Sequence, residues 1–401
     1  MLKKMENNTG NFYIDVASIQ KEKHANEICG DVFLTKKVSA EDRTIIVLSD
    51  GLGSGIKANI LASVTASMAV NFTSMNAPLA HTAEIILSTL PVDRERKVGY
   101  SSFTIIDIEA GGTIHFVEYG NPEILYFREN ETLELKKTPV TIKNRFRLKQ
   151  PLFYSNCTGR RNDRIVVCSD GISQSGIGSR AYPFGWGIKN VNAYIRDEIS
   201  RHPGISSFDL CRKLLANAIA NDTFKAKDDI TAGVVYLREA RRLMVCSGPP
   251  YDENKDTMLA RDLDRFAGTK IICGGTTANI IAREMHREIC TNLSHTSFQL
   301  PPVSSMDNID LITEGILTLG KAHRLLEEGF KPDLVSKDPA VMLCNHFLLH
   351  DEIVFVVGTK VNEAHQDPSL PVELEIRRNV IKKIARELED NYLKTININY
   401  I

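Results

Sequence analysis

The sequence lacks any long uninterrupted apolar segment: nowhere do eighteen apolar residues follow one another, as they would in a membrane-spanning helix. It also lacks a charge imbalance, because 49 Lys and Arg residues are matched by 50 Asp and Glu residues, for a formal net charge of −1. Neither nucleic acid nor a membrane is therefore indicated as a partner. Residues 1–20 contain no apolar stretch of the kind found in secretory signals, so we expect a cytoplasmic protein.

Paired cysteines are absent as well. The eight cysteines include no C-x-x-C pair, and Cys168 and Cys246 each end an apolar run. This placement is typical of buried, reduced thiols and not of disulfides or a zinc site. What is present, 43% hydrophobic and 25% charged residues over 401 positions, is the composition of a globular protein large enough for two domains.

The first 240 residues contain short strands interrupted by helices. Period-two alternation between turn-forming residues predicts strands, and Ala-rich or 3.6-period segments predict helices. The expected strands are residues 31–38, 43–48, 103–108, 114–119, 124–127, 164–169 and 230–237, and the expected helices are residues 57–72, 80–90 and 206–220. We expect the three strands between residues 103 and 127 to form one antiparallel meander. This succession favours an α+β fold of layered antiparallel sheets covered by helices over a parallel array.

A charged stretch at residues 238–242 follows the last of these strands, so we expect one domain at residues 1–240 and another at residues 241–401. The second domain is smaller and is predicted to be mixed α/β. Its expected strands are residues 270–273 and 352–357, and its expected helices are residues 279–289, 313–328 and 372–390.

A glycine turn in the second domain joins an expected strand to an expected helix. The turn contains Gly274, Gly275, Thr276 and Thr277. Because the N-terminus of a helix can bind an anion, these residues are a candidate site for a small anionic ligand. The alternative is a tight turn in which Thr276 or Thr277 acts as the N-cap.

Two segments of the first domain repeat one pattern. Residues 45–51 and residues 165–171 are each an apolar strand that ends in Ser-Asp-Gly. A carboxylate such as Asp50 or Asp170 at the end of a rigid strand has few conformations, and the glycine that follows lets a backbone carbonyl turn toward the same point. The pattern is typical of a site for a hard cation.

Further carboxylates stand at the ends of other strands. Asp31 opens one expected strand, and Asp228 and Asp229 precede another. A set of oxygen ligands without nearby Cys or His favours Mg²⁺ or Mn²⁺ over zinc or copper. The alternative for each aspartate taken alone is an ordinary turn or cap residue.

Five short motifs follow one another along the first domain. They are Gly30-Asp31, Asp50-Gly51-Leu52-Gly53-Ser54-Gly55, Gly120-Asn121-Pro122, Ser169-Asp170-Gly171 and Asp228-Asp229-Ile230-Thr231. Each is weak alone, but in this order and spacing residues 12–238 resemble the PP2C superfamily of metal-dependent protein phosphatases, and within it the bacterial SpoIIE-like branch. The C-terminal domain resembles no family that we recognise.

The resemblance implies an αββα sandwich, two antiparallel sheets flanked by helices, with two Mn²⁺ or Mg²⁺ ions at one end. It implies that Asp50 bridges both ions. Asp170 and Asp228 would complete one site, and Asp31, through water, and the Gly51 carbonyl would serve the other. The implied activity is hydrolysis of phosphoserine or phosphothreonine in a phosphoprotein by a metal-activated water, without a covalent phosphoenzyme.

The chain departs from the family pattern in two respects. Leu52 stands where some members have a histidine that protonates the leaving group, and the phosphate-binding arginine of the eukaryotic branch has no clear counterpart. The alternative function is therefore a catalytically weak signalling module whose C-terminal domain binds a small anionic ligand or a partner protein. Homodimerisation stays open. Residues 174–187 are expected to form either a substrate flap or an ordinary glycine-rich connection.

Overall fold

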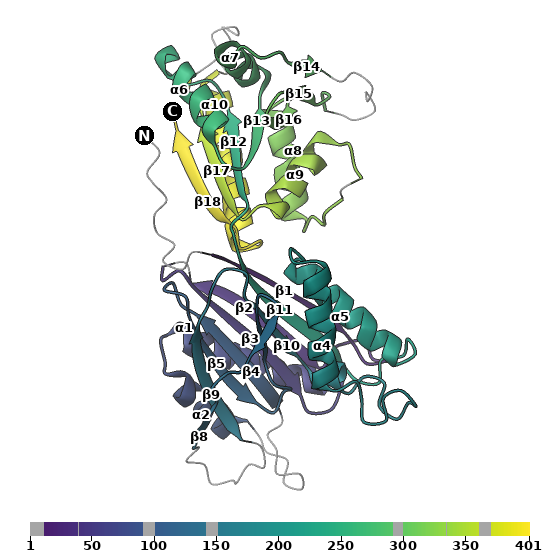
Figure 1. Ribbon diagram of the computed structural model, residues 1–401. Coiled ribbons are helices and arrows are strands. Elements are labelled where there is room, and N and C mark those ends of the chain that lie inside the picture. The colour runs from purple at the N-terminus through teal and green to yellow at the C-terminus, as the bar shows by residue number, and fades with distance from the viewer. Residues whose placement is uncertain are drawn as a thin grey trace. The chain divides into compact units, whose positions relative to one another are not determined.

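The computed structural model describes residues 12–38, 40–90, 101–141, 151–291, 300–333, 335–360 and 370–401 (Figure 1). The chain divides into two compact units, Met1–Glu239 and Ala240–Ile401. Two antiparallel sheets make up the first unit, and the second unit is built on one mostly parallel sheet. Among the described residues, no helix is both long enough and apolar enough to span a bilayer.

One sheet of the first unit has the strand order β2-β3-β4-β5-β9-β8, with every neighbouring pair antiparallel. Its strands are β2 (Asp31–Val38), β3 (Arg43–Gly51), β4 (Ser101–Ile108), β5 (Thr113–Tyr119), β8 (Thr138–Val140) and β9 (Leu152–Thr158). Helices α1 (Ile56–Ser74) and α2 (Leu79–Thr89) cover its outer face. Ala66 and Ala69 are fully buried on α1, and their small side chains let the helix lie close to the sheet.

The other sheet has the order β1-β11-β10-β6-β7. Its strands are β1 (Tyr13–Lys21), β6 (Leu125–Arg128), β7 (Glu131–Leu133), β10 (Arg164–Cys168) and β11 (Ile230–Arg238). Helices α4 (Ile188–Arg201) and α5 (Ser207–Asn221) cover its outer face (Figure 1). Between the sheets lies an apolar core that includes Ile46, Phe116, Tyr126 and Val235. The predicted α+β fold with two antiparallel sheets flanked by helices is therefore confirmed.

The expected strands and helices of the first unit are present, but the predicted meander is wrong. Strands β4 and β5 pair within one sheet, whereas β6 pairs with β10 in the other sheet. The chain leaves the first sheet after Tyr119, where Gly120 has φ 77° and Pro122 has no N–H to continue a ladder. The Glu118 carboxylate accepts a hydrogen bond from the Ile124 backbone N–H at 2.9 Å, which fixes the redirected chain. Alternation predicts a strand but not its partner.

The second unit has five parallel strands in the order β16-β13-β12-β17-β18, extended by the antiparallel strands β15 and β14. The strands are β12 (Arg242–Ser247), β13 (Thr269–Cys273), β14 (Cys290–Thr291), β15 (Ser304–Met306), β16 (Ile309–Thr313), β17 (Glu352–Val357) and β18 (Thr395–Tyr400). The helices are α6 (Asp256–Arg265), α7 (Gly275–Met285), α8 (Ile316–Glu327), α9 (Pro339–Leu349) and α10 (Leu370–Asp390). The predicted mixed α/β architecture is confirmed.

The parallel part of this sheet is doubly wound. Helices α6 and α7 bury their apolar sides on one face, and α8, α9 and α10 pack on the other. Numbered along the chain, the parallel strands run 3-2-1-4-5, so the strand order reverses at β12. The predicted buried thiols are present too: Cys168 and Cys246 are free and buried.

Candidate metal centre

Asp31 and Asp50 lie opposite each other on β2 and β3 as cross-strand partners. The Asp31 side chain is 3% exposed, and its Oδ2 accepts a hydrogen bond from the Thr231 hydroxyl at 2.7 Å. Gln20 Nε2 donates in turn to Thr231 Oγ1 and to the Asp31 carbonyl, each at 3.1 Å. Thr231 of β11 and Gln20 of β1 therefore hold Asp31, at the start of β2, in one orientation.

The second sheet supplies Asp170 and Asp228. Asp170 begins the short helix α3 (Asp170–Ser173) directly after β10, and its Oδ2 accepts a hydrogen bond from Gln174 Nε2 at 2.8 Å. Asp228 precedes β11, and its Oδ1 accepts from the Asp229 backbone N–H at 3.0 Å. The two sheets thus each contribute carboxylates, whose charges act on the pKa of Asp50.

Three glycines allow the backbone segments of this region to approach closely. A Cβ on Gly51 would lie 2.1 Å from the Ala58 carbonyl oxygen, and one on Gly171 would lie 2.0 Å from the Asp229 carbonyl oxygen. A Cβ on Gly30 would lie 2.7 Å from Asp229 Oδ2. The motif glycines are therefore required by contact between neighbouring segments, which any side chain would prevent.

The electrostatics of the cluster are those of crowded like charges. Burial raises the pKa of Asp31 to about 6; hydrogen bonding to Thr231 opposes that shift, and Asp229 and Asp170 add to it. Burial also raises the pKa of Asp50 well above its usual value, and the nearby charges of Asp31 and Asp170 raise it further. Both carboxylates consequently hold protons at higher pH than a solvated aspartate unless a cation offsets their charge.

The pKa values of Asp170 and Asp228 are raised as well. Burial raises the pKa of each, followed for Asp170 by the charge of Asp228. The charge of Lys23 acts in the opposite direction and lowers the pKa of Asp228. Burial raises the pKa of the neighbouring Cys29 thiol to about 12, with a contribution from the charge of Asp31.

Asp229 is a member of the cluster that the sequence interpretation did not include among the ligands. Its side chain is 4% exposed, and its Oδ1 accepts a hydrogen bond from the Lys23 backbone N–H at 3.0 Å. Its Oδ2 is buried and has no hydrogen-bond partner among the described residues. The doubled acid at positions 228 and 229 was the available signal, but sequence alone did not show which of the two carboxylates is buried.

The donor set fits a hard divalent cation. It offers carboxylate oxygens from five aspartates, and the buried, unpartnered Asp229 oxygen is the kind of group that a cation satisfies. Within the described part of the chain, no three acidic, histidine or cysteine side chains are already grouped closely enough to hold a metal ion. Carboxylates that repel one another are expected to stand apart until a cation draws them together.

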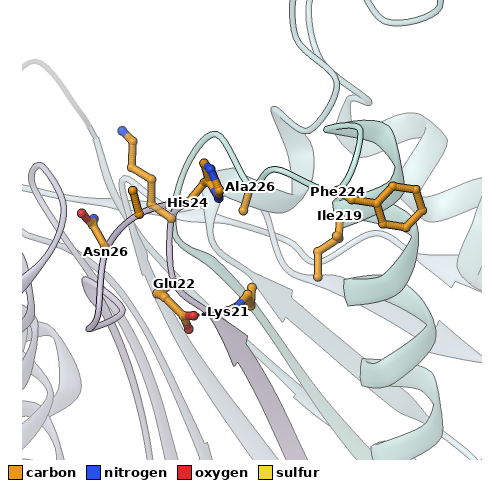
Figure 2. Close-up of a pocket in the computed structure, with 9 residues that line it drawn as sticks. Lys21, Glu22, His24, Asn26, Ile219, Phe224 and Ala226 are labelled. Atoms are coloured by element: carbon orange, nitrogen blue, oxygen red, sulfur yellow. Dashed lines mark hydrogen bonds and ion pairs between the residues drawn. The ribbon is translucent and has the colours of Figure 1, made fainter.

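Figure 2 shows a cavity of about 90 Å³ in the first unit. One wall is residues 21–26, the end of β1 and the loop that follows it, and the other is formed by Ile219, Phe224 and Ala226 at the end of α5 and after it. The His24 backbone N–H donates to the Ala226 carbonyl at 2.8 Å, which holds the two walls together. Through its contact with Asp229, the residue 21–26 loop joins this cavity to the acidic cluster.

The glycine-rich segment at residues 174–187 folds back on its own origin. The Trp186 N–H donates to the Ser175 carbonyl at 2.8 Å, and the Gly187 N–H donates to the Ser173 carbonyl at 2.7 Å. The Asp222 carboxylate accepts from the Gly176 N–H at 2.7 Å. These contacts favour the ordinary connection over the substrate flap.

In the second unit, the candidate ligand turn differs from its prediction in one respect. Helix α7 begins at Gly275, four residues earlier than expected, and its N-cap is Gly274 with φ 135°. The predicted N-cap role of Thr276 or Thr277 is therefore wrong, because both residues lie in the first turn of the helix. The chain can start the helix this early because glycine accepts the required backbone conformation.

Comparison with known proteins places the first unit in context. Residues 40–238 match the family model described as Stage II sporulation protein E (SpoIIE), which confirms the resemblance read from the motifs. No curated protein matches the chain.

Several solved structures are similar at low identity. The PP2C phosphatase domain with a regulatory-domain fragment of SpoIIE from Bacillus subtilis is 16% identical over 57% of this chain and 64% of that chain, with a TM-score of 0.46. RsbX in complex with magnesium is 18% identical over 56% of this chain and 95% of that chain, with a TM-score of 0.38. The S. agalactiae serine/threonine phosphatase is 15% identical over 56% of this chain and 100% of that chain, with a TM-score of 0.40. The chain thus spans less than two thirds of that SpoIIE structure.

Proposed function

We propose that residues 1–240 form a cytoplasmic, metal-dependent phosphoprotein phosphatase of the PP2C type that acts on phosphoserine or phosphothreonine. The main support is the convergence of carboxylates from two sheets, whose pKa values are raised by burial and by one another, so that the ionised cluster requires cations. The family match over residues 40–238 supports the reaction class.

Asp31, Asp50, Asp170 and Asp228, together with the Gly51 carbonyl, would hold two Mn²⁺ or Mg²⁺ ions. When bound, such ions supply an activated water nucleophile and offset charge on the phosphoryl oxygens. The protein's own contribution is orientation: each carboxylate is carried on a rigid strand end, and their mutual repulsion favours cation binding.

Hydrolysis assays test this function directly. With Mn²⁺, the protein is expected to hydrolyse p-nitrophenyl phosphate and a phosphoserine peptide, and EDTA or Asp50→Asn is expected to abolish both activities. Glu27→Gln, which removes one exposed charge from the loop before β2, serves as the control and is expected to retain activity. Activity that survives both EDTA and Asp50→Asn would contradict the metal mechanism.

A second function is proposed for residues 241–401, binding of a small anionic ligand that regulates the first unit. In doubly wound sheets, ligands bind beyond the carboxyl ends of the parallel strands. Two such ends meet here, because a Cβ on Gly315 would lie 3.3 Å from the Gly274 Cα. Helices α7 and α8 start from these glycines, and in each the third residue, Thr277 or Thr318, has a buried hydroxyl with no hydrogen-bond partner among the described residues.

Two substitutions at Gly275 separate this ligand site from a plain turn. No atom lies within 4 Å of a Cβ placed on Gly275, so both Gly275→Ala and Gly275→Asp are sterically tolerated. Inorganic phosphate and adenosine monophosphate are the probes, and thermal shift of the full chain is the readout. Gly275→Asp is expected to remove the shift and Gly275→Ala to keep it; equal shifts in both variants, or none in the parent protein, would contradict the proposal. Homodimerisation remains a separate prediction for sedimentation analysis.

A further inference from the structure

The cavity beside the acidic cluster, which we call the docking cavity, has an apolar side and a polar side. Ile219 and Phe224 lie on one side of it, and Lys21, Glu22 and His24 lie on the other (Figure 2). The Lys21 ammonium is paired with the Glu22 carboxylate, so these two side chains carry no net charge. The cavity therefore offers a surface for an apolar group, and its lining residue Lys23 can attract an anion.

Lys23 lines the docking cavity and lies at the edge of the acidic cluster. Its backbone N–H donates to Asp229, whereas its ammonium forms no hydrogen bond or ion pair with any residue that the structure describes. The contact with Asp229, which neighbours Asp228 in the chain, places Lys23 at the edge of the acidic cluster. An anionic group drawn to Lys23 would thus lie next to the aspartates.

Phe224 forms the exposed rim of the docking cavity in an unusual conformation. Its side chain is 79% exposed, and both Thr223 and Phe224 have positive φ, 55° and 61°. A bulky residue rarely adopts this region, because its Cβ crowds the backbone. Strain of this kind persists where the surrounding structure enforces it, and it is concentrated at functional sites.

Asp222 supports this conformation. Its buried carboxylate accepts a hydrogen bond from the Lys227 N–H at 3.0 Å, which spans the strained pair, and another from the Gly176 N–H at 2.7 Å, which attaches the turn to the segment at residues 174–187. The Phe224 N–H also donates to the Ile219 carbonyl at 2.9 Å. The turn that leads into Asp228 is therefore built to hold a large apolar side chain out toward solvent, where water alone gives no reason for one.

We propose that the docking cavity binds the polypeptide around the phosphorylated residue of a phosphoprotein substrate and selects a large apolar side chain there. Phe224 and Ile219 would pack against that side chain, and Lys23 would attract the phosphorylated segment toward the aspartates. The proposal rests on the proposed phosphatase function, and it adds the class of sequence that the site prefers.

A pair of peptides tests this selection by binding, without depending on turnover. Both carry a non-hydrolysable phosphonate analogue of phosphoserine and a fluorophore, and they differ only in having leucine or glycine on each side of it. Fluorescence anisotropy with the full chain and Mn²⁺ is expected to give about tenfold tighter binding of the leucine peptide, since burial of an apolar side chain is favourable.

Three variants assign the preference to the docking cavity. Phe224→Ala is expected to reduce it to about twofold or less, and Phe224→Asn should do the same while fitting the positive φ, because asparagine tolerates that region. Phe208→Ala, which removes another exposed phenylalanine at the start of α5 that does not line the cavity, should keep the tenfold preference.

The inference and the proposed function fail in different ways. Equal binding of the two peptides by the parent protein, a preference that survives both Phe224 variants, or the same loss in Phe208→Ala would overturn the inference. Failure to hydrolyse p-nitrophenyl phosphate and unmodified phosphoserine peptides with Mn²⁺ would overturn the phosphatase function, whereas the binding preference would still decide the role of the cavity.

Discussion

The substitution that removes the proposed activity is expected to stabilise the metal-free protein. Asp50 is half-buried opposite Asp31, and its carboxylate forms no hydrogen bond with the residues that the structure describes. Asparagine is nearly isosteric with aspartate, so Asp50→Asn removes one charge and its repulsion of Asp31 without creating a cavity. In EDTA at pH 7.5 we therefore expect the first unit to unfold at a higher temperature in this variant than in the parent protein.

The size of the effect follows from Asp50 itself. Burial raises the pKa of Asp50 well above its usual value, and the charges of Asp31 and Asp170 raise it further, so ionisation of this carboxylate at neutral pH costs folding free energy. At about 1.4 kcal/mol for each pKa unit, we expect Asp50→Asn to stabilise the metal-free unit by about 1–3 kcal/mol, which for a unit of this size raises Tm by roughly 3–10 °C.

The stability of the metal-free protein is expected to fall as pH rises. Because the folded-state pKa of Asp31 is raised, the folded protein holds a proton that the unfolded chain has lost between pH 3.8 and about 6. The stability contributed by that proton is complete below pH 3.8 and is lost as pH rises through about 6. In EDTA, the parent protein should therefore lose stability between pH 5 and pH 7.5, and Asp50→Asn should lose less.

Differential scanning calorimetry of the full chain measures this effect, with Mn²⁺ as the second condition. Mn²⁺ is expected to raise the Tm of the parent protein, because a ligand of the folded state stabilises it, and to have little effect on Asp50→Asn. Glu27→Gln neutralises an exposed carboxylate nearby and should change stability by less than about 0.5 kcal/mol. An unchanged or lower Tm for Asp50→Asn in EDTA at pH 7.5 would refute the account of a repulsive, cation-requiring cluster.

Two further predictions concern the packing of the first unit. Gly171→Ala places a Cβ only 2.0 Å from the Asp229 carbonyl oxygen, so we expect about 1–3 kcal/mol of destabilisation and a smaller Mn²⁺-induced Tm shift. Gly111→Ala, where the Cβ meets no atom within 4 Å, is the matched control. Equal destabilisation by the two substitutions would contradict the argument from close approach. Asp107→Ala leaves the Arg43 guanidinium buried without the carboxylate that contacts it at 2.5 and 2.7 Å. Urea unfolding should therefore show a loss of about 3–5 kcal/mol in the free energy of unfolding, and adding Arg43→Met should recover much of it. No recovery in the double variant would contradict the role of this ion pair.

Much of the first unit could be predicted because its signals are local. The apolar strand that ends at Asp50, the one that ends before Asp170, and the Ala-rich helix at residues 57–72 are specified by residues a few positions apart. A strand followed by Asp-Gly fixes where a carboxylate stands on its own element. The order of several such ends then indicated the metal-site hypothesis.

The pairing of strands and the first residue of one helix could not be predicted in the same way. The expected meander failed at β6, since residues 124–127 are all apolar and can bury side chains on both faces of either sheet. The N-cap of α7 was also missed, because a glycine before two threonines can start a helix in more than one register.

The sequence by itself determined the strands that lead to the proposed ligands, namely β2, β3, β10 and β11, together with the glycines beside them and the carboxylates at their ends. Only the tertiary structure decided that Asp229 is buried beside Gly30, that Thr231 holds Asp31 across 200 positions of the chain, and that Phe224 stands at the rim of a cavity next to the aspartates. The physical reason is distance along the chain: local patterns report the preferences of neighbouring residues, whereas burial, pKa and docking surfaces arise when segments remote in sequence pack against one another.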